Sequence, residues 1–325
     1  MGGRRPGHEP RLWILVAVAL AAGNAPTDSA PEGRVAPGSA STSIGSPNHG
    51  RLEGGVPLPE KGPGFRFNPR RDPAARFGTA EVVSALVRAA GAVHREMPGG
   101  ELTVNDLSYE KGGDIPHHGS HRSGRDVDVL FYLQDESGAP LPSVGAPLDP
   151  RGRGVDFKDL GDPGDDVPVQ LDTPRTWRFV QALLEDREAH LQRIFVAEHL
   201  RAILLGHARR TGAPRRAVQR FAHLTCQPSY PHDDHFHFRF FCTPEDIRKG
   251  CEDALPIYPW HRRHLREAGV QPVRARPRPR APKPKVTTHE EAREEAGPMH
   301  EDVVAWLDER EAWLNKPHPG RPYCR

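Results

Sequence analysis

The stretch HFHFRFF at residues 235–241 constrains the fold more strongly than any other part of the chain. In a β-strand, successive side chains point to opposite faces. One face would therefore carry three phenylalanines, namely Phe236, Phe238 and Phe240. The other face would carry His235, His237 and Arg239. The pattern predicts a strand with one face in the core and a functional site on the other, because neighbouring imidazoles rarely share an open strand face without a role.

A second dense group of polar residues precedes an apolar run more than a hundred positions earlier, in HHGSHRSGRDVDVLFYL. His118 and His121 precede Asp126 and Asp128, and the run at 127–133 predicts a buried strand. Asp126 and Asp128 would share one face of it. If this strand neighbours the one at 235–241, Asp128 lies beside His237.

These two groups favour a metal site. Two histidines at i and i+2 can face one metal together, or one can bind while the other handles protons. Two histidines and a carboxylate suit Zn²⁺ and leave a position for water. A purely structural role is common for a single histidine, but two such groups beside apolar strands favour metal binding. His117 is interpreted as a loop residue.

The remaining pattern predicts an α+β fold, with a small antiparallel sheet flanked by helices and carrying a mononuclear zinc site. Helical spacing of apolar residues starts after Thr79 and recurs in 171–184 and 199–212. Further strands are expected at 101–109 and 193–197. Residues 134–170 are expected to form a long loop rich in Gly, Pro and Asp.

The ends of the chain differ from its centre. Residues 1–25 have a basic start and a short apolar run, which predicts an export signal, with an uncleaved membrane anchor as the alternative. Residues 26–62 are interpreted as a flexible leader rich in Pro, Gly and Ser, and 63–255 as the folded domain. In 256–325 we expect a Pro-rich basic linker and one short helix, docked through Trp306 and Trp313. Because of the predicted export signal, the chain is expected to act in the periplasm or to be secreted.

Charge and cysteines narrow the function further. A formal net charge of +2 argues against a nucleic-acid-binding surface. The four cysteines, in an exported chain, favour disulfides over a zinc site, because no CxxC pair is present; they are Cys226, Cys242, Cys251 and Cys324. The chain has no H-E-x-x-H, G-x-S-x-G or P-loop motif.

The two site motifs resemble those of a known family. HHGSHRSGRDVD is similar to the G-H-x-S-H-x-x-G-x-D-V-D segment of the penicillin-insensitive murein endopeptidases, within the lysostaphin and D-Ala-D-Ala metallopeptidase group. PHDDHFH is similar to that family's G-H-D-x-H-F-H, with Pro231 in place of glycine. The resemblance covers about 63–252 and leaves out the leader and the C-terminal segment. The proline removes an N–H and fixes φ, which affects the conformation of His232.

The resemblance implies specific roles for these residues. His121, Asp128 and His237 would bind one zinc ion, and His235 would act near the reacting water as general base or transition-state stabiliser. His118 and His232 would line the pocket, where a second metal stays open. Asp126, or a carboxylate of the 134–170 loop, would orient the ligands. The resemblance also implies a disulfide between Cys242 and Cys251, which leaves Cys226 and Cys324 for a second one.

The function expected from this resemblance is that of an exported zinc endopeptidase that cuts peptidoglycan at the D-alanyl–diaminopimelate cross-link or an adjacent stem-peptide bond. A D,D-carboxypeptidase or dipeptidase of the same group is the enzymatic alternative. A non-catalytic, zinc-stabilised wall-binding protein is the alternative from another class, although it would not need His235. The expected partner is peptidoglycan, without nucleic acid and without a stable membrane anchor after signal cleavage.

Overall fold

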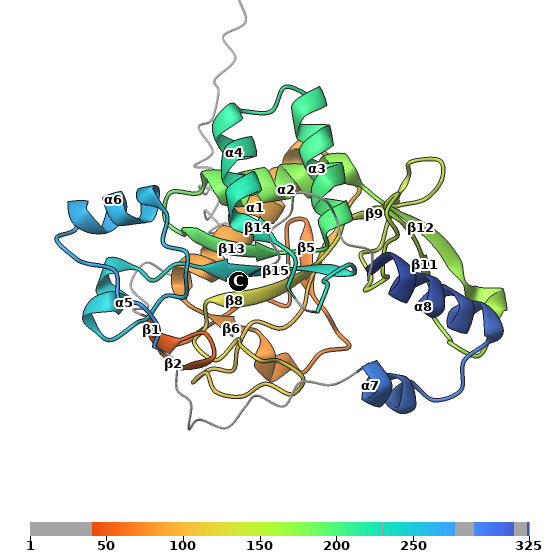
Figure 1. The fold of residues 1–325 in the computed structure, drawn as a ribbon, viewed down its shortest axis with the longest axis horizontal. Coiled ribbons are helices and arrows are strands. Elements are labelled where there is room, and N and C mark those ends of the chain that lie inside the picture. The colour runs from red at the N-terminus through yellow and green to blue at the C-terminus, as the bar shows by residue number, and fades with distance from the viewer. Residues whose placement is uncertain (1–40, 229, 277–288, 315–323, 325) are drawn as a thin grey trace, which may run out of the picture. The chain divides into compact units, whose positions relative to one another are not determined.

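Strand β15 (His235–Phe240) lies inside a seven-stranded sheet whose strand order is β14-β13-β15-β8-β7-β5-β4 (Figure 1). The computed structural model describes residues 41–228, 230–276, 289–314 and 324. Contacts divide the chain into Met1–Glu32 and Gly33–Arg325, and every described residue belongs to the second unit. The other strands of the sheet are β4 (Lys61–Gly62), β5 (Phe65–Phe67), β7 (Leu102–Val104), β8 (Asp126–Leu130), β13 (Leu191–Phe195) and β14 (Thr225–Cys226).

The expected alternation in β15 is confirmed. Phe236, Phe238 and Phe240 are each at most 1% exposed and belong to the main hydrophobic core. Phe238 packs edge-on against Phe179, with ring centroids 6.0 Å apart, and so joins the sheet to the helices. The phenylalanine face thus fixes which side of the strand carries the histidines.

Four helices lie together beside this sheet in Figure 1: α1 (Ala80–Glu96), α2 (Thr173–Glu185), α3 (Glu198–Arg210) and α4 (Arg215–Leu224). Helix α2 begins as expected, because the Asp172 side chain accepts a hydrogen bond from Arg175 N at 3.1 Å and Pro174 occupies the first turn. Its buried face includes Trp177, which packs edge-on against Phe221 of α4.

The expectation of a small, antiparallel sheet is wrong in size and only partly confirmed in strand direction, because most neighbouring strands of the main sheet are antiparallel. The main sheet has seven strands, and two of its pairings, β13 with β14 and β5 with β7, are parallel. The residues expected to form a loop, 134–170, also contribute to a second, four-stranded sheet. Its strands are β9 (Leu133–Gln134), β10 (Pro140–Leu141), β11 (Arg153–Asp156) and β12 (Val167–Leu171), with the short helix η2 (Pro163–Asp165) before β12. Strands of two to five residues are too short to show a clear alternation in the sequence.

Order begins earlier than the predicted leader allows, because strands occupy residues 42–62. Besides β4 and β5, the N-terminal elements are β1 (Thr42–Ser46), β2 (His49–Glu53), β3 (Val56–Pro57), η1 (Pro73–Ala75) and β6 (Phe77–Gly78). A buried arginine explains this order: Arg125 donates to Ser43 Oγ at 2.9 Å and to Asp253 Oδ1 at 2.9 Å. These two bonds join β1 to distant parts of the chain. This segment is therefore folded, although its composition is typical of a linker. The predicted signal at 1–25 lies outside the described residues.

The C-terminal part contains α5 (Pro244–Arg248), α6 (Pro259–Glu267), α7 (His289–Ala296) and α8 (Glu301–Leu314). The helix expected at the C-terminus is α8, and α6 lies where a linker was expected. The docking of α8 differs from the prediction. Val303 is its buried residue, while the rings of Trp306 and Trp313 pack against each other with their centroids 5.2 Å apart. Both expected disulfides, Cys242–Cys251 and Cys226–Cys324, are present. Within the described ranges, no helix is long and apolar enough to cross a membrane.

Candidate metal centre

Two neighbouring strands bring the aspartates and histidines together. Strands β15 and β8 pair in antiparallel fashion, with His237 opposite Asp128 and Arg239 opposite Asp126. His237 Nδ1 lies 3.2 Å from Asp128 Oδ1. The strand pairing that the sequence left conditional therefore exists, and it places the two polar faces side by side.

His121 reaches this point from the loop before β8. Its backbone has a φ of 69°, a left-handed conformation that is uncommon for residues other than glycine. Its Nδ1 donates to the carbonyl oxygen of Leu107 at 2.7 Å, and its own carbonyl accepts from Ser108 Oγ at 2.6 Å. These bonds fix the ring and leave Nε2 with a lone pair, 3.5 Å from Asp128 Oδ1.

The donor atoms at this point suit a metal ion. Ligand atoms of His118, His121 and Asp128 all lie within 4.8 Å of one another. Three buried atoms in the site lack a hydrogen-bond partner: His121 Nε2, Asp128 Oδ1 and His237 Nε2. A buried polar atom without a partner is unusual in a folded protein and is explained when an ion binds there. The residues therefore fit a metal ion with nitrogen and oxygen ligands.

Carboxylates surround the site and orient its imidazoles. Asp126 lies 3.3 Å from His237 Nε2 and accepts two hydrogen bonds from Arg239, each at 2.8 Å. His118 Nε2 donates to Asp106 at 3.1 Å, while its Nδ1 lies 3.5 Å from Asp128 Oδ2. Contacts of this kind set the tautomer and direction of metal-binding histidines.

His235 and His232 lie at the edge of this group. His235 Nδ1 donates to Asp234 at 2.7 Å, which directs Nε2 toward Asp128 Oδ1, 3.7 Å away. The rings of His232 and His235 are 4.8 Å apart. His232 has a φ of 54°, and its Nδ1 donates to Tyr230 O at 2.6 Å. Pro231 thus precedes a left-handed residue whose ring faces the site.

The electrostatics of the site are those of a cation-binding centre. Burial favours the neutral form of Asp128, but His121, His235 and His237 outweigh it and hold the carboxyl pKa well below its usual range. Burial also opposes protonation of His235, yet Asp234 and Asp128 raise its pKa to about 9. For His232, burial and the nearby imidazoles lower the pKa to about 3. A bound divalent cation would itself balance the negative charges of Asp128 and Asp234 and oppose protonation of His235.

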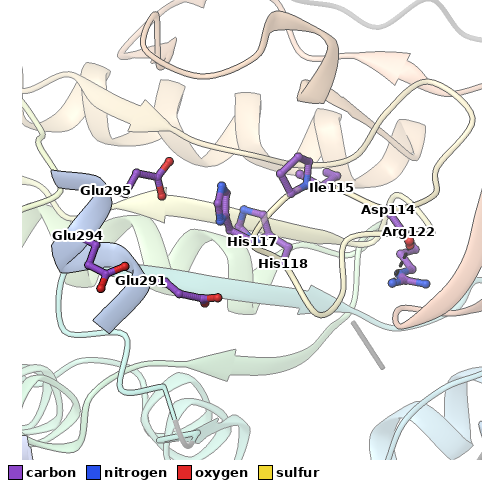
Figure 2. A pocket seen from close by; sticks show the side chains of 9 residues that line it. Asp114, Ile115, His117, His118, Arg122, Glu291, Glu294 and Glu295 are labelled. Carbon is purple, nitrogen blue, oxygen red and sulfur yellow. Dashed lines mark ion pairs between the residues drawn. The ribbon is translucent and has the colours of Figure 1, made fainter. Parts of the chain in front are cut away.

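A cleft of about 750 Å³ adjoins this centre at His118. Figure 2 shows the His117–His118 loop on one side of it and helix α7 on the other. The α7 side chains at the cleft are Glu291, Glu294 and Glu295. A substrate that approaches His118 through this cleft would therefore pass an acidic helix.

Sequence reasoning missed several residues that now belong to the surroundings of the site. They are Asp106, Asp233, Asp234 and the carbonyl group of Leu107. The pair Asp233-Asp234 belongs to a polar run of a kind that is usually solvated, yet Asp233 is 0% exposed. The spacing of Asp234 next to His235 was the one available signal, because an adjacent carboxylate can hold the second ring nitrogen of a histidine.

The mixed α/β fold and its buried His/Asp cluster define a candidate metalloenzyme. Residues 43–261, which are most of the chain, match the penicillin-insensitive murein endopeptidase family. The chain belongs to this family, and it is a metallopeptidase. The resemblance drawn from the motifs is confirmed, and the matched region starts at β1 rather than near residue 63.

Individual relatives agree. A penicillin-insensitive murein endopeptidase of Klebsiella pneumoniae subsp. pneumoniae is 26% identical over 223 residues, which cover 68% of this chain and 73% of that protein. Proteins of the same name from Yersinia pestis bv. Antiqua and Yersinia pseudotuberculosis are each 25% identical over 215 residues, which cover 66% of this chain and 71% of theirs. The family match ends at residue 261, so α7 and α8 lie beyond it.

Proposed function

We propose that this protein is an exported, zinc-dependent endopeptidase that hydrolyses D-alanyl–diaminopimelate cross-links, or an adjacent stem-peptide bond, in peptidoglycan. The observation that carries the proposal is the buried cluster around Asp128, whose Oδ1 atom lacks a hydrogen-bond partner and faces His121 Nε2 at 3.5 Å. Membership of a murein endopeptidase family supports the substrate class.

The proposed zinc ligands are His121, Asp128 and His237. Their support is the Leu107 bond that directs His121 Nε2 inward and the register that pairs His237 with Asp128. In this arrangement His118 lines the pocket beside the ion, although its donor atom also lies within 4.8 Å of those of His121 and Asp128. Two histidines and one carboxylate are a common ligand set of catalytic zinc.

When bound, zinc would polarise the scissile carbonyl and lower the pKa of a water molecule. His235 is proposed as the general base, which takes the proton of the attacking water at Nε2 and passes it to the leaving amine. Asp234 supports this role because it accepts the Nδ1 proton and so leaves Nε2 available. Asp126 and Arg239 would hold the His237 ring in place.

Export to the periplasm or beyond is part of the proposal. It is supported by the basic and apolar pattern of residues 1–25 and by the two disulfides, which persist in oxidising compartments. The substrate lies in the same compartment, so localisation and activity support each other.

Purified protein incubated with isolated muropeptides tests the proposal by mass spectrometry. Wild-type protein is expected to convert cross-linked dimers to monomers, a chelator to stop the conversion, and added zinc to restore it. His235→Ala is expected to lower kcat by on the order of 100- to 10,000-fold, which is the usual contribution of a general base. Release of free D-alanine from pentapeptide monomers, with the dimers left intact, would instead establish a carboxypeptidase.

A further inference from the structure

The short segment that leads into β15 is held by a cation from the C-terminal helix α8. The Asp233 carboxylate is 0% exposed and accepts two hydrogen bonds from Arg310, from Nε at 2.8 Å and from Nη2 at 2.6 Å. Paired bonds between a guanidinium and a carboxylate restrict both position and orientation. Asp233 is followed directly by Asp234 and His235.

Helix α8 is itself anchored, so Arg310 is presented from a fixed position. Val303 is 3% exposed, and His300 N donates to Leu160 O at 2.7 Å. Beyond the helix, Cys324 forms a disulfide with Cys226 of β14. These contacts hold α8 and Cys324 against the folded domain, although both lie outside the family match, which ends at residue 261.

The backbone of the same segment is held by other parts of the fold. Leu148 N donates to Asp233 O at 2.9 Å, and Ala197 N donates to His232 O at 2.9 Å. The two backbone bonds hold the main chain at His232 and Asp233, and the ion pair with Arg310 holds the Asp233 side chain. Asp234, the hydrogen-bond acceptor of His235, is the next residue in the chain, so a shift of Asp233 is passed directly to it.

We propose that Arg310 is a positioning residue: through Asp233 it fixes the segment that orients His235 toward the metal centre. The inference rests on the proposed function, because it assigns His235 a part in the reaction. Without Arg310, the buried Asp233 carboxylate has no ionic partner, which favours a movement of the segment that hydrates it. A displacement of about 1 Å at a reacting group can lower a rate by on the order of 100-fold.

The test compares three full-length variants loaded with zinc: Arg310→Ala, Arg310→Lys and Arg293→Ala. Arg293 is the matched control, because it forms an exposed ion pair with Asp308 within the same C-terminal segment, at 3.1 Å. Arg310→Ala is expected to lower kcat by roughly 10- to 100-fold with KM within about twofold of the wild type. Arg310→Lys keeps the charge but not the paired bonds, so its kcat is expected to lie between those of Arg310→Ala and the wild type. The kcat of Arg293→Ala is expected to match that of the wild type.

A merely structural role would lower the melting temperature without changing kcat per zinc-loaded molecule, and that result overturns the inference. Equal losses in Arg310→Ala and Arg293→Ala also overturn it. If Arg310→Ala does not fold, Arg310→Lys decides: a lowered kcat supports the inference and a wild-type kcat overturns it.

A second measurement separates this inference from the proposed function. Hydrogen exchange at the amides of 232–236 is expected to be faster in Arg310→Ala, or in Arg310→Lys if the alanine variant does not fold, and unchanged in Arg293→Ala. If wild-type protein leaves cross-linked muropeptides uncut, the proposed function fails, and exchange at these amides alone then decides whether Arg310 fixes the segment. Wild-type exchange in the Arg310 variant overturns the inference in either case.

Discussion

At the scale of single residues, the choice of metal ligands depends on what each imidazole already contacts. His121 uses one nitrogen on Leu107 O, and His237 has Asp126 beside one nitrogen and Asp128 beside the other. His118 is less buried than either and already donates to Asp106. Because a metal-binding histidine usually has its other ring nitrogen held by an oxygen, these contacts suit all three residues. The lower exposure of the His237 side chain, 9% against 18% for His118, is the difference on which we propose His237 as the third ligand.

Single alanine substitutions test that choice. His121→Ala and His237→Ala are expected to weaken zinc binding by more than the roughly 10- to 100-fold that follows the loss of an outer contact. His118→Ala is expected to keep zinc binding within that smaller range. Zinc content after dialysis against a competing chelator measures all three. Loss of zinc from His118→Ala, with zinc retained in His237→Ala, would contradict the ligand assignment.

At the scale of elements, the residues that predicted structure well were those with long, regular patterns. The alternation in 235–241 predicted β15 and its two faces, and apolar spacing predicted α1, α2 and α3. Strands such as β4 and β14 have only two residues each, so they carry no pattern of their own and depend on pairing with distant neighbours. The size of the sheet therefore could not be predicted from the sequence.

Helix α5 carries an aspartate whose ionisation depends on the fold. Asp246 is 2% exposed, its Oδ1 accepts from Ser43 N at 3.2 Å, and its Oδ2 lacks a hydrogen-bond partner. Burial and the nearby Glu81 raise the pKa of Asp246 to about 7, from 3.8, despite the opposing charge of Arg125. The folded state therefore binds a proton here that the unfolded state has already released at neutral pH.

The sign of the pH dependence follows from this shift. The contribution of Asp246 to stability is complete below pH 3.8 and is lost as the pH rises toward 7, by about 1.4 kcal/mol for each unit of pKa difference. Asp246→Asn removes that loss, so the variant is expected to gain stability over the wild type between these values and to keep a constant advantage above pH 7. Urea unfolding at several pH values measures it; an advantage independent of pH would contradict the argument.

At the scale of the whole molecule, the sequence predicted which histidines and aspartates lie together better than it predicted the buried ion pairs that hold the surrounding segments in place. The histidines and aspartates stood out because they cluster next to apolar strands. The buried pairs Arg125–Asp253 and Arg310–Asp233 join residues that are 128 and 77 positions apart, and each arginine looks like many others in a chain with 45 basic residues. Such pairs become visible only when the fold brings their partners together.

In the proposed function, hydrolysis requires one metal ion held by this His/Asp cluster. Titration of zinc into chelator-treated protein, with cleavage of a cross-linked muropeptide followed at each addition, tests it most directly. We expect no cleavage without metal, a linear rise in rate as zinc is added, and a break in that rise at one zinc ion per chain. Undiminished cleavage by the metal-free protein, or a rate that does not respond to added zinc, would contradict it.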